Sequence, residues 1–234
     1  MKNIVVTGGT KGIGKAIVER FAQEKFHIIT CSRKSSNVES LLDEIKQNYP
    51  DCKIDVLAAD LSQKAEVLRF AEFVKEKTKQ IDVLVHNTGV FLPGQIHNEA
   101  EGTIEKMIET NVYSAYHLTR ALLPLMMPFG QGHIFTICST ASIIPYVNGG
   151  SYCISKFALL GMTKVLREEM KAHNIRVTAL LPGATLTDSW AGVDLPPERF
   201  IKPEDISQTL WSAYQLSFQT VIEEILIRPQ LGDI

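Results

Sequence analysis

The chain has 234 residues, of which 45% are hydrophobic and 21% charged, and its formal net charge is −2 at pH 7. This length suits one well-buried core, and no linker, composition break or internal repeat indicates a second unit, so we expect one domain over residues 1–234. The near-neutral charge provides no field to attract a polyanion, which argues against nucleic acid as a partner.

The cysteines and the N-terminus indicate the cellular compartment. The four cysteines have no C-x-x-C spacing, so we expect free thiols in a reducing environment and no metal site. No apolar run approaches the ~18 residues of a membrane span, and a glycine turn follows the first strand before a signal peptide could form. We therefore expect a cytoplasmic protein that does not enter the membrane.

Short β-branched apolar runs alternate with stretches of helical periodicity, a pattern typical of a parallel sheet covered by helices on both faces. The predicted strands are 3–7, 26–31, 53–58, 82–86, 133–138, 176–181 and 221–227. The predicted helices are 12–24, 37–49, 63–79, 101–110, 112–127, 151–173 and 203–217. Prolines at positions 50, 128, 182 and 203 fall at the edges of these elements and support their bounds.

The connections between parallel strands are expected to be right-handed crossovers. They predict an α/β fold with a doubly wound, Rossmann-type sheet in the strand order 3-2-1-4-5-6-7. A ligand is expected where the strand order reverses, beside the C-terminal ends of the first and fourth strands. These ends carry Thr7-Gly8 and Asn87-Thr88-Gly89.

A glycine turn, Thr7-Gly8-Gly9-Thr10-Lys11-Gly12-Ile13-Gly14, joins the first strand to the first helix. Its glycines let the backbone approach a pyrophosphate, which the positive N-terminal end of the helix faces. The spacing is G-x3-G-x-G and not G-x-G-x-x-G, and a plain strand-to-helix connection is the alternative. The position after the first strand favours dinucleotide binding.

The end of the second strand, Cys31-Ser32-Arg33-Lys34, contains no carboxylate to bind the 2′-hydroxyl of NAD. Arg33 offers a planar fork to a 2′-phosphate. Lys11 indicates the same preference, because a cation beside a helix N-terminus is disfavoured by ~0.3–1 kcal/mol unless an anion offsets it. We therefore predict NADP(H) as the cofactor, with solvated loop charges as the alternative reading of Arg33 and Lys34.

Tyr152 and Lys156 open the predicted helix 151–173, where residues four apart lie on one face. An ammonium group ~4 Å from a phenol stabilises the phenolate by about 4 kcal/mol at an effective dielectric constant of ~20, which permits acid–base chemistry near neutral pH. The other Y-x-x-x-K match, at 49–53, contains a proline and cannot be a helical turn.

Two further polar residues follow strand ends. Ser139, after the fifth strand, is expected to hydrogen-bond a substrate oxygen across the cleft. The alternative for Ser139 is a hydroxyl that satisfies its own loop, with Ser142 in the substrate role. Asp60, after the third strand, is expected to accept a hydrogen bond from adenine or to cap the following helix, and the two roles are compatible.

These motifs together resemble those of the short-chain dehydrogenase/reductase family, in its single-domain form, over essentially the whole chain. The matching motifs are Thr7-Gly8-x3-Gly12-x-Gly14, Asp60, Asn87-Thr88-Gly89, Asn111, Ser139, Tyr152-x3-Lys156 and Pro182-Gly183. The resemblance implies a hydride-transfer enzyme in which Tyr152 is the acid and base, Lys156 supports it and holds the nicotinamide ribose, and Ser139 positions the substrate. It also implies that Asn111 completes a water-linked proton relay to Lys156.

The resemblance also implies a set of cofactor contacts, among which the Pro182-Gly183 turn and the stretch 185–187 hold the nicotinamide carboxamide. The expected cofactor-binding residues are Thr7, Gly8, Thr10, Lys11, Gly12, Ile13, Gly14, Ser32, Arg33, Asp60, Leu61, Asn87, Gly89, Tyr152, Lys156, Pro182, Gly183, Thr185 and Thr187. The chain departs from the family at His86-Asn87-Thr88-Gly89, where Asn-Asn-Ala-Gly is usual, and we assign no role to His86 or Thr88.

The substrate loop is expected at 184–202. Trp190, Leu195 and Phe200 are the side chains expected to cover an apolar or planar substrate, and Gly192 is expected to permit movement. Ordinary surface packing is the alternative reading of this loop.

The C-terminal sequence VIEEILIRPQLGDI and the pair Ser189-Trp190 are most similar to the branch of the family that contains bacterial sepiapterin reductases. The resemblance implies an NADPH-dependent reductase of a small ketone or dicarbonyl, and a 3-oxoacyl-carrier-protein reductase is the alternative. A carrier protein needs a basic patch, for which the loop supplies only Arg199 and Lys202. A pterin needs a carboxylate, for which the candidates are Asp188, Asp194 and Asp233.

A non-catalytic NADP(H)-binding sensor is the alternative from another functional class, but it does not require Ser139, Tyr152 and Lys156 together. A nucleotide-sugar epimerase is disfavoured because too few residues follow the last predicted strand to form a substrate domain. Family members usually pair through their fifth and sixth helices, here 112–127 and 151–173, so a homodimer or homotetramer is implied.

Overall fold

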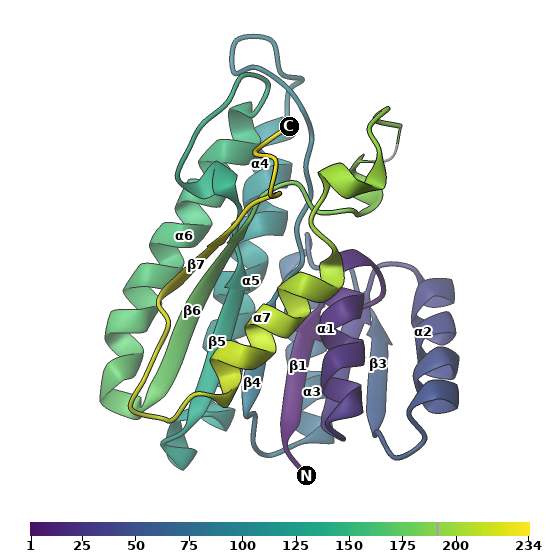
Figure 1. The fold of residues 1–234 in the computed structure, drawn as a ribbon. Helices are drawn as coiled ribbons and strands as arrows, with labels where there is room; N and C mark the ends of the chain where they lie inside the picture. The colour runs from purple at the N-terminus through teal and green to yellow at the C-terminus, as the bar shows by residue number, and fades with distance from the viewer. Residues whose placement is uncertain (191) are drawn as a thin grey trace.

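A parallel sheet of seven strands runs through the centre of the molecule in the computed structural model, which describes residues 1–190 and 192–234 (Figure 1). The strands are β1 (Asn3–Thr7), β2 (His27–Ser32), β3 (Ile54–Ala58), β4 (Val83–His86), β5 (Gly132–Ile137), β6 (Ile175–Pro182) and β7 (Glu224–Ile227). Their order in the sheet is β3-β2-β1-β4-β5-β6-β7, which confirms the predicted α/β class and topology.

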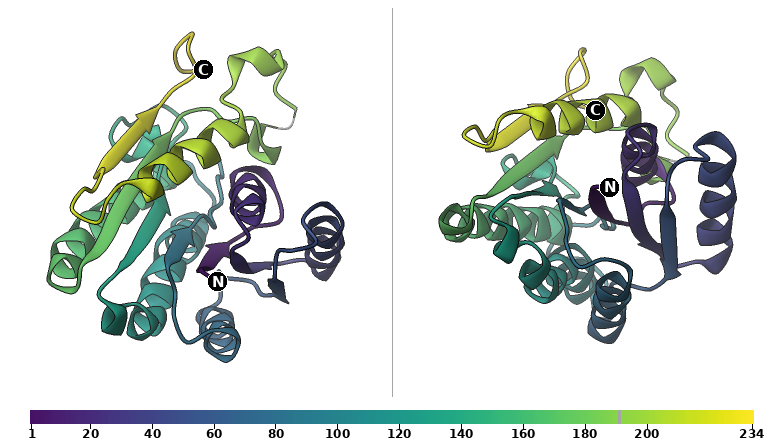
Figure 2. Two further views of the ribbon diagram at one scale, coloured as in Figure 1. Left: turned by 60° about the horizontal axis from the view of Figure 1, so that its bottom comes forward. Right: turned by 90° about the horizontal axis from the view of Figure 1, so that it is seen from below.

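Helices cover both faces of this sheet, with α1, α2 and α7 on one face and α3, α5 and α6 on the other (Figure 2). The helices are α1 (Gly12–Gln23), α2 (Ser35–Asn48), α3 (Lys64–Lys77), α4 (Thr103–Ile108), α5 (Ser114–Leu122), α6 (Gly150–Met170) and α7 (Pro203–Gln215). Side chains alternate across each strand, so Ile4 and Val6 of β1 belong to the core beneath α1 and α7, whereas Val5 belongs to the core beneath α3 and α5.

One predicted boundary is wrong. The helices predicted over 101–110 and 112–127 form one continuous helical run, because a π-helical turn, Glu109–Tyr113, joins α4 to α5. Asn111 lies in this turn and is only 1% exposed. Such turns insert an extra residue into a helix and often occur at functional sites.

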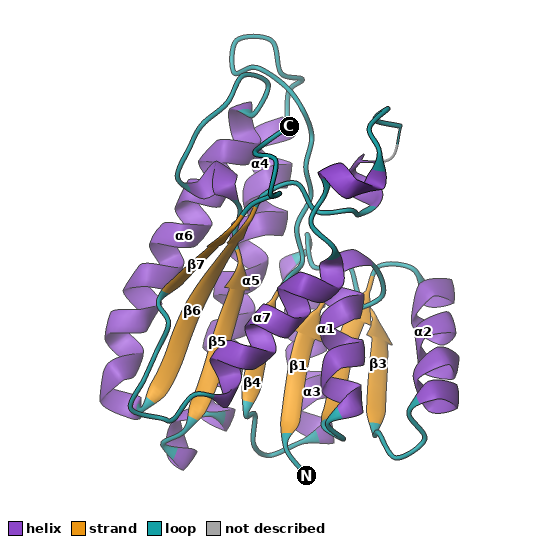
Figure 3. Cartoon of the chain, viewed as in Figure 1, coloured by secondary structure: helices purple, strands orange, loops and turns teal. Residues whose placement is uncertain are grey.

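The carboxyl ends of all seven strands lie along one edge of the sheet because the strands are parallel. The loops after β4, β5 and β6 and the segment after β7 extend beyond this edge (Figure 3). The reversal of strand order, where a ligand is expected, lies at this edge, beside β1 and β4. No helix in residues 1–190 and 192–234 is long and apolar enough to cross a bilayer.

His86 ends β4 in the interior and is only 4% exposed. Its Nε2 lies 2.7 Å from the hydroxyl oxygen of Thr119, and its Nδ1 has no hydrogen-bond partner among the described residues. Burial lowers the pKa of His86 to about 4. The ring is therefore neutral at pH 7 and serves the core, in agreement with our assigning it no catalytic role.

Acid is expected to destabilise the protein partly through His86. Its pKa is about 4 in the folded state and ~6.5 in an unfolded chain. Between these values the unfolded state binds a proton that the native state does not, so the unfolding free energy falls as the pH falls, by ~1.4 kcal/mol per pH unit. His86→Gln keeps a polar partner for Thr119 but cannot titrate. Urea unfolding from pH 7 to pH 4.5 should show a shallower slope for this variant, and equal slopes would contradict the account.

Candidate active site

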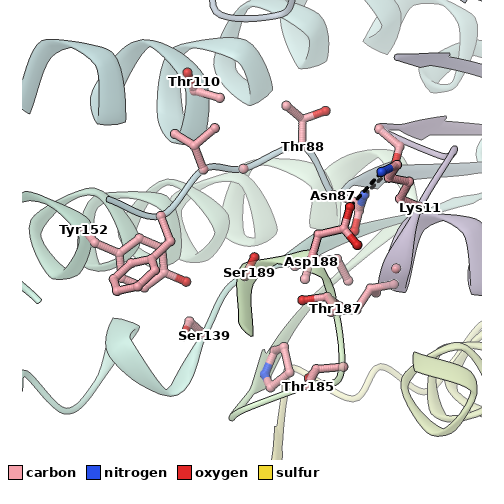
Figure 4. A pocket seen from close by; sticks show the side chains of 18 of the residues that line it. Lys11, Asn87, Thr88, Thr110, Ser139, Tyr152, Thr185, Thr187, Asp188 and Ser189 are labelled. Carbon is pink, nitrogen blue, oxygen red and sulfur yellow. Dashed lines mark hydrogen bonds and ion pairs between the residues drawn. The ribbon is translucent and has the colours of Figure 1, made fainter. Parts of the chain in front are cut away.

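A cavity of about 1100 Å³ opens at the carboxyl edge of the sheet, between the glycine turn and the first turn of α6. Lys11 and Asn87 lie at one end of it and Tyr152 and Ser139 at the other (Figure 4). The predicted site residues that line it are Gly8, Thr10, Lys11, Gly12, Ile13, Ser32, Arg33, Asp60, Leu61, Asn87, Gly89, Ser139, Tyr152, Lys156, Pro182, Gly183, Thr185 and Thr187.

Three predicted residues, Thr7, Gly14 and Asn111, do not line the cavity but support its walls. The hydroxyl oxygen of Thr7 accepts hydrogen bonds from the backbone amides of Asn87 at 2.9 Å and Thr88 at 3.0 Å. The side-chain amide of Asn87 donates in return to the carbonyls of Thr7 at 2.9 Å and Gly8 at 3.1 Å. These bonds join the end of β4 to the glycine turn after β1.

The glycine turn has a backbone that other residues rarely adopt. Gly8 has a φ of +68° and Gly12 a φ of +50°, both in the left-handed region that favours glycine. A side chain at Gly12 would also place its Cβ 2.9 Å from Cγ2 of Thr187 in the loop after β6. Glycine at these positions therefore lets the turn lie close against the loop after β6 at the N-terminus of α1.

The end of the cavity beside β2 is basic. Arg33 and Lys34 follow β2, line the cavity and are exposed, and neither forms an ion pair with a described residue. The hydroxyl of Thr10 donates to that of Ser32 at 2.9 Å and bridges the two neighbouring loops. Asp60 lines the cavity, and its carboxylate accepts a hydrogen bond from the amide of Ser62 at 3.1 Å. This bond lies in the loop before α3, whose N-cap is Gln63, so the expected capping of the helix by Asp60 is wrong.

Lys11 has an anionic partner within the protein. Its ammonium group lies 2.8 Å from a carboxylate oxygen of Asp188 in the loop after β6, with side chains 61% and 76% exposed. The anion that offsets Lys11 is thus Asp188, which removes the argument that Lys11 by itself requires a bound phosphate. Exposed pairs of this kind contribute only ~0–1 kcal/mol, so a phosphate can compete for the lysine.

Lys156 is the buried cation at the other end of the cavity, and it is only 5% exposed. Its ammonium group donates to the carbonyl oxygen of Ile137 at 2.9 Å and lies 5.8 Å from the centre of the Tyr152 ring. No carboxylate of the described residues lies within ion-pair distance of it. The Tyr152 ring packs edge to face on Phe91, with centroids 4.9 Å apart.

Ser139 and Asn111 differ in their access to the cavity, since Ser139 lines it and Asn111 is 1% exposed. Ser139 lines the cavity, and its hydroxyl oxygen also accepts a hydrogen bond from the amide of Ala141 at 3.1 Å, which is the loop-satisfying role given above as its alternative. Ser142 does not line the cavity; it is 1% exposed and its hydroxyl oxygen accepts a hydrogen bond from the Ser139 amide at 3.2 Å. Asn111 accepts from the amide of Val90 at 2.8 Å and donates to its carbonyl at 3.1 Å. An added Cβ on Gly89 would lie 3.4 Å from the Asn111 oxygen and 3.6 Å from the Lys156 nitrogen, which places both groups on one wall.

The loop expected to bind substrate is closed at its base, where the amide of Ile201 donates to the carbonyl of Ala184 at 2.9 Å. Trp190 lines the cavity as predicted. Leu195 and Phe200 do not line it, because Leu195 faces solvent and Phe200 packs behind Trp190 with ring centres 5.3 Å apart. Position 191 of this loop lies outside the described residues.

The three candidate substrate carboxylates are separated by the structure. Asp188 and Asp233 line the cavity and Asp194 does not. Asp188 is paired with Lys11, and Asp233 lies 3.1 Å from the guanidinium of Arg228. Neither carboxylate is therefore free of a cation.

Several lining residues are not evident from the sequence. They are apolar or aromatic and include Phe91, Ile144, Tyr146, Val147 and Ile234. Burial raises the pKa of Tyr146 above its ordinary value, so its hydroxyl stays protonated and acts as a neutral wall. These residues come from irregular loops whose periodicity carries no signal; only the position of Phe91, two residues after the Asn87-Thr88-Gly89 turn, could have indicated it.

Comparisons with known proteins agree with this geometry. The family model described as short chain dehydrogenase matches residues 2–196. A sepiapterin reductase from Chlorobaculum tepidum is 34% identical over 243 aligned residues, which cover 100% of this chain and 99% of the relative. A 3alpha-hydroxysteroid dehydrogenase from Mediterraneibacter gnavus is 35% identical, covering 86% of this chain and 80% of the relative.

Two solved structures show the same fold. An alcohol dehydrogenase from the archaeon Thermococcus sibiricus, complexed with 5-hydroxy-NADP, has a TM-score of 0.91 and 25% identity, covering 100% of this chain and 99% of that chain. L-sorbose reductase from Gluconobacter frateurii, complexed with NADPH and L-sorbose, has a TM-score of 0.90 and 26% identity, covering 97% and 95%.

Replacing Gly14 with alanine is expected to disturb the glycine turn. The added Cβ would lie 2.5 Å from the Asn87 side-chain nitrogen and clash with the Gly8 carbonyl, so backbone must move. We expect a loss of about 1–3 kcal/mol of stability, or roughly 2–12 °C in unfolding temperature. Thermal unfolding measures this, with Gln47→Ala on the exposed side of α2 as the control. Unchanged unfolding of Gly14→Ala would show that the turn is not tightly packed.

Proposed function

Because the chain belongs to the short-chain dehydrogenase family, we propose that it is an NADP(H)-dependent reductase of a small ketone or dicarbonyl, of the sepiapterin-reductase type. The observation that carries this proposal is one cavity lined by the glycine turn and by Ser139, Tyr152 and Lys156. A sensor that only binds the cofactor has no need of an acid beside a buried cation at the end of that cavity.

The residues of the cavity fit an NADP(H) cofactor. The glycine turn presents backbone amides at a helix N-terminus, and Arg33 and Lys34 line the cavity at the end of β2 without an ion-pair partner among the described residues. We assign the pyrophosphate to the glycine turn and the 2′-phosphate to Arg33. The other residues expected to contact the cofactor also line the cavity, among them Asp60, Leu61, Thr185 and Thr187. When bound, NADPH supplies the hydride.

The protein's own groups supply the proton and the orientation. Tyr152 donates its hydroxyl proton to the carbonyl oxygen as the carbonyl carbon accepts the hydride, which yields the alcohol and a tyrosinate. Lys156 stabilises that tyrosinate because its buried ammonium has no competing carboxylate among the described residues. Ser139 hydrogen-bonds the substrate oxygen and fixes its direction. Asn111, beside Lys156, is assigned to the path along which water returns the proton.

The substrate end of the cavity favours a planar or apolar molecule. Phe91, Tyr146, Val147 and Trp190 contribute apolar or aromatic surface there. The similarity to a sepiapterin reductase over the full length of both chains supports the same substrate class. Neither Arg199 nor Lys202 lines the cavity, so the structure offers little support for docking an acidic carrier protein.

We also assign the outer faces of α5 and α6 to pairing between copies of the chain. These faces carry exposed apolar side chains, which a second copy can cover. They include Tyr113, just before α5, with Tyr116, Ile154, Phe157 and Val165.

The proposed reaction is tested by a panel of carbonyl compounds, each assayed by the loss of NADPH absorbance and in parallel with NADH. The panel contains sepiapterin, 1-phenyl-1,2-propanedione and an acetoacetyl thioester. We expect reduction of the first two, with a lower KM for NADPH than for NADH. Reduction of the thioester alone would support the carrier-protein alternative. Failure of every compound would return the chain to the sensor class, and equal KM values would overturn the NADP(H) assignment.

Replacing Tyr152 with phenylalanine is expected to remove the proton donor and leave the cofactor site in place. We expect kcat to fall by ~10²-fold or more, since positioned acid catalysis is of that size. NADPH affinity, measured by fluorescence titration, should stay within about twofold, because the ring and its contact with Phe91 remain. The matched control is Tyr49→Phe, at the end of α2 and outside the cavity. A Tyr152→Phe protein with the kcat of the wild type would exclude the tyrosine as the acid.

A further inference from the structure

We propose that Glu99 is a positioning residue for the catalytic tyrosine, a role that rests on the proposed function. Glu99 belongs to the loop between β4 and α4 and accepts two hydrogen bonds from the start of α6. One oxygen of its carboxylate accepts from the backbone amide of Ser151 at 2.8 Å, and the other accepts from the Ser151 hydroxyl. Ser151 is 2% exposed and directly precedes Tyr152.

The carboxylate supplies a partner that the helix lacks. The first amides of an α-helix have no intrahelical acceptor, and the residue before α6, Gly149, has no side chain with which to cap them. Glu99 fills that role from 52 residues away. A carboxylate also interacts favourably with the positive end of the helix. Its removal is therefore expected to loosen the first turn of α6.

The same loop fixes the turn that leads into α6. The amide of Gly94 donates to the carbonyl of Asn148 at 3.0 Å, and the side chain of Gln95 donates to that of Asn148 at 2.8 Å. Asn148 has a φ of +66°, in the left-handed region, and these two bonds hold it there. The loop between β4 and α4 and the start of α6 are thus connected by several hydrogen bonds, and Glu99 is the charged residue among them.

Close packing leaves the Glu99 side chain little freedom. A Cβ added to Gly94 would lie 2.6 Å from the Glu99 Cγ, and one added to Gly150 would clash with the carboxylate. The acid is thus enclosed between two glycines and Ser151. Such enclosure is expected of a group that sets a position and not of a solvated surface charge.

A second hydrogen bond from outside α6 holds the next turn of the helix, four residues after Ser151. The side-chain nitrogen of Asn111 donates to the hydroxyl of Ser155 at 2.9 Å. Ser151 and Ser155 therefore lie on one face of α6, and each forms a hydrogen bond to a side chain outside the helix. The residue that follows each of them, Tyr152 and Lys156, lines the cavity. Without Glu99 the hydrogen bond between Asn111 and Ser155 remains. We therefore expect Tyr152 to be displaced more than Lys156.

The test compares Glu99→Ala, Glu99→Gln and the control Glu101→Ala, which removes an exposed carboxylate from the same loop. With sepiapterin or 1-phenyl-1,2-propanedione as substrate, we expect Glu99→Ala to lower kcat about 10-fold, since displacement of a catalytic group by less than 1 Å costs that much. NADPH affinity should stay within about twofold. Glu99→Gln keeps an acceptor for the Ser151 amide and should recover part of kcat, and Glu101→Ala should match the wild type.

Hydrogen–deuterium exchange of the NADPH-bound protein adds a readout that does not depend on turnover. Glu99→Ala should speed exchange of the amides at 151–153 and leave the later turns of α6 unchanged. If the wild type reduces no carbonyl, the proposed function fails while this exchange result still decides whether Glu99 holds the helix. If Glu99→Ala does not fold, Ser151→Ala, which keeps the backbone bond, should show the same pattern at about threefold in kcat.

Two results would overturn the inference. One is a Glu99→Ala protein with wild-type kcat and wild-type exchange at 151–153. The other is an equal loss of kcat and of NADPH affinity with faster exchange along all of α6, which would make Glu99 a general stabiliser of the fold.

Discussion

A buried ammonium group without a carboxylate partner is the constraint on which this site depends. Lys156 is 5% exposed and donates to the carbonyl of Ile137, and no described acid neutralises it. Burying an unpaired charge costs free energy, so a fold that keeps one must gain something from it. In the proposed reaction that gain comes from an adjacent phenol that becomes anionic and from a cofactor hydroxyl, which accounts for Tyr152 one helical turn away.

Much of the arrangement is predictable from the sequence because its causes are local. Apolar alternation and helix periodicity set the strands and helices, and the right-handed crossover rule sets their order. The glycine turn is predictable because positive φ angles, such as those of Gly8 and Gly12, favour glycine. The proximity of Tyr152 and Lys156 is predictable because a four-residue spacing in a helix puts two side chains on one face.

Contacts between distant segments are not predictable in this way. The pair of Lys11 with Asp188 joins residues 177 apart, and it overturned an argument based on helix charge alone. The π-helical turn around Asn111 has no sequence period of its own, so the sequence predicts two helices where the structure has one continuous helical run. The contact of Phe91 with Tyr152 likewise depends on how a loop of irregular sequence folds back onto α6.

The central claim is that the charge of Lys156 drives proton transfer from Tyr152. Its most direct test is the single-turnover rate of NADPH oxidation in Lys156→Met, at saturating NADPH and with the best carbonyl substrate. Methionine fills a similar volume and removes the buried charge, so the fold should persist. The account predicts a rate lower by ~10²-fold or more. A rate within about twofold of the wild type would contradict it.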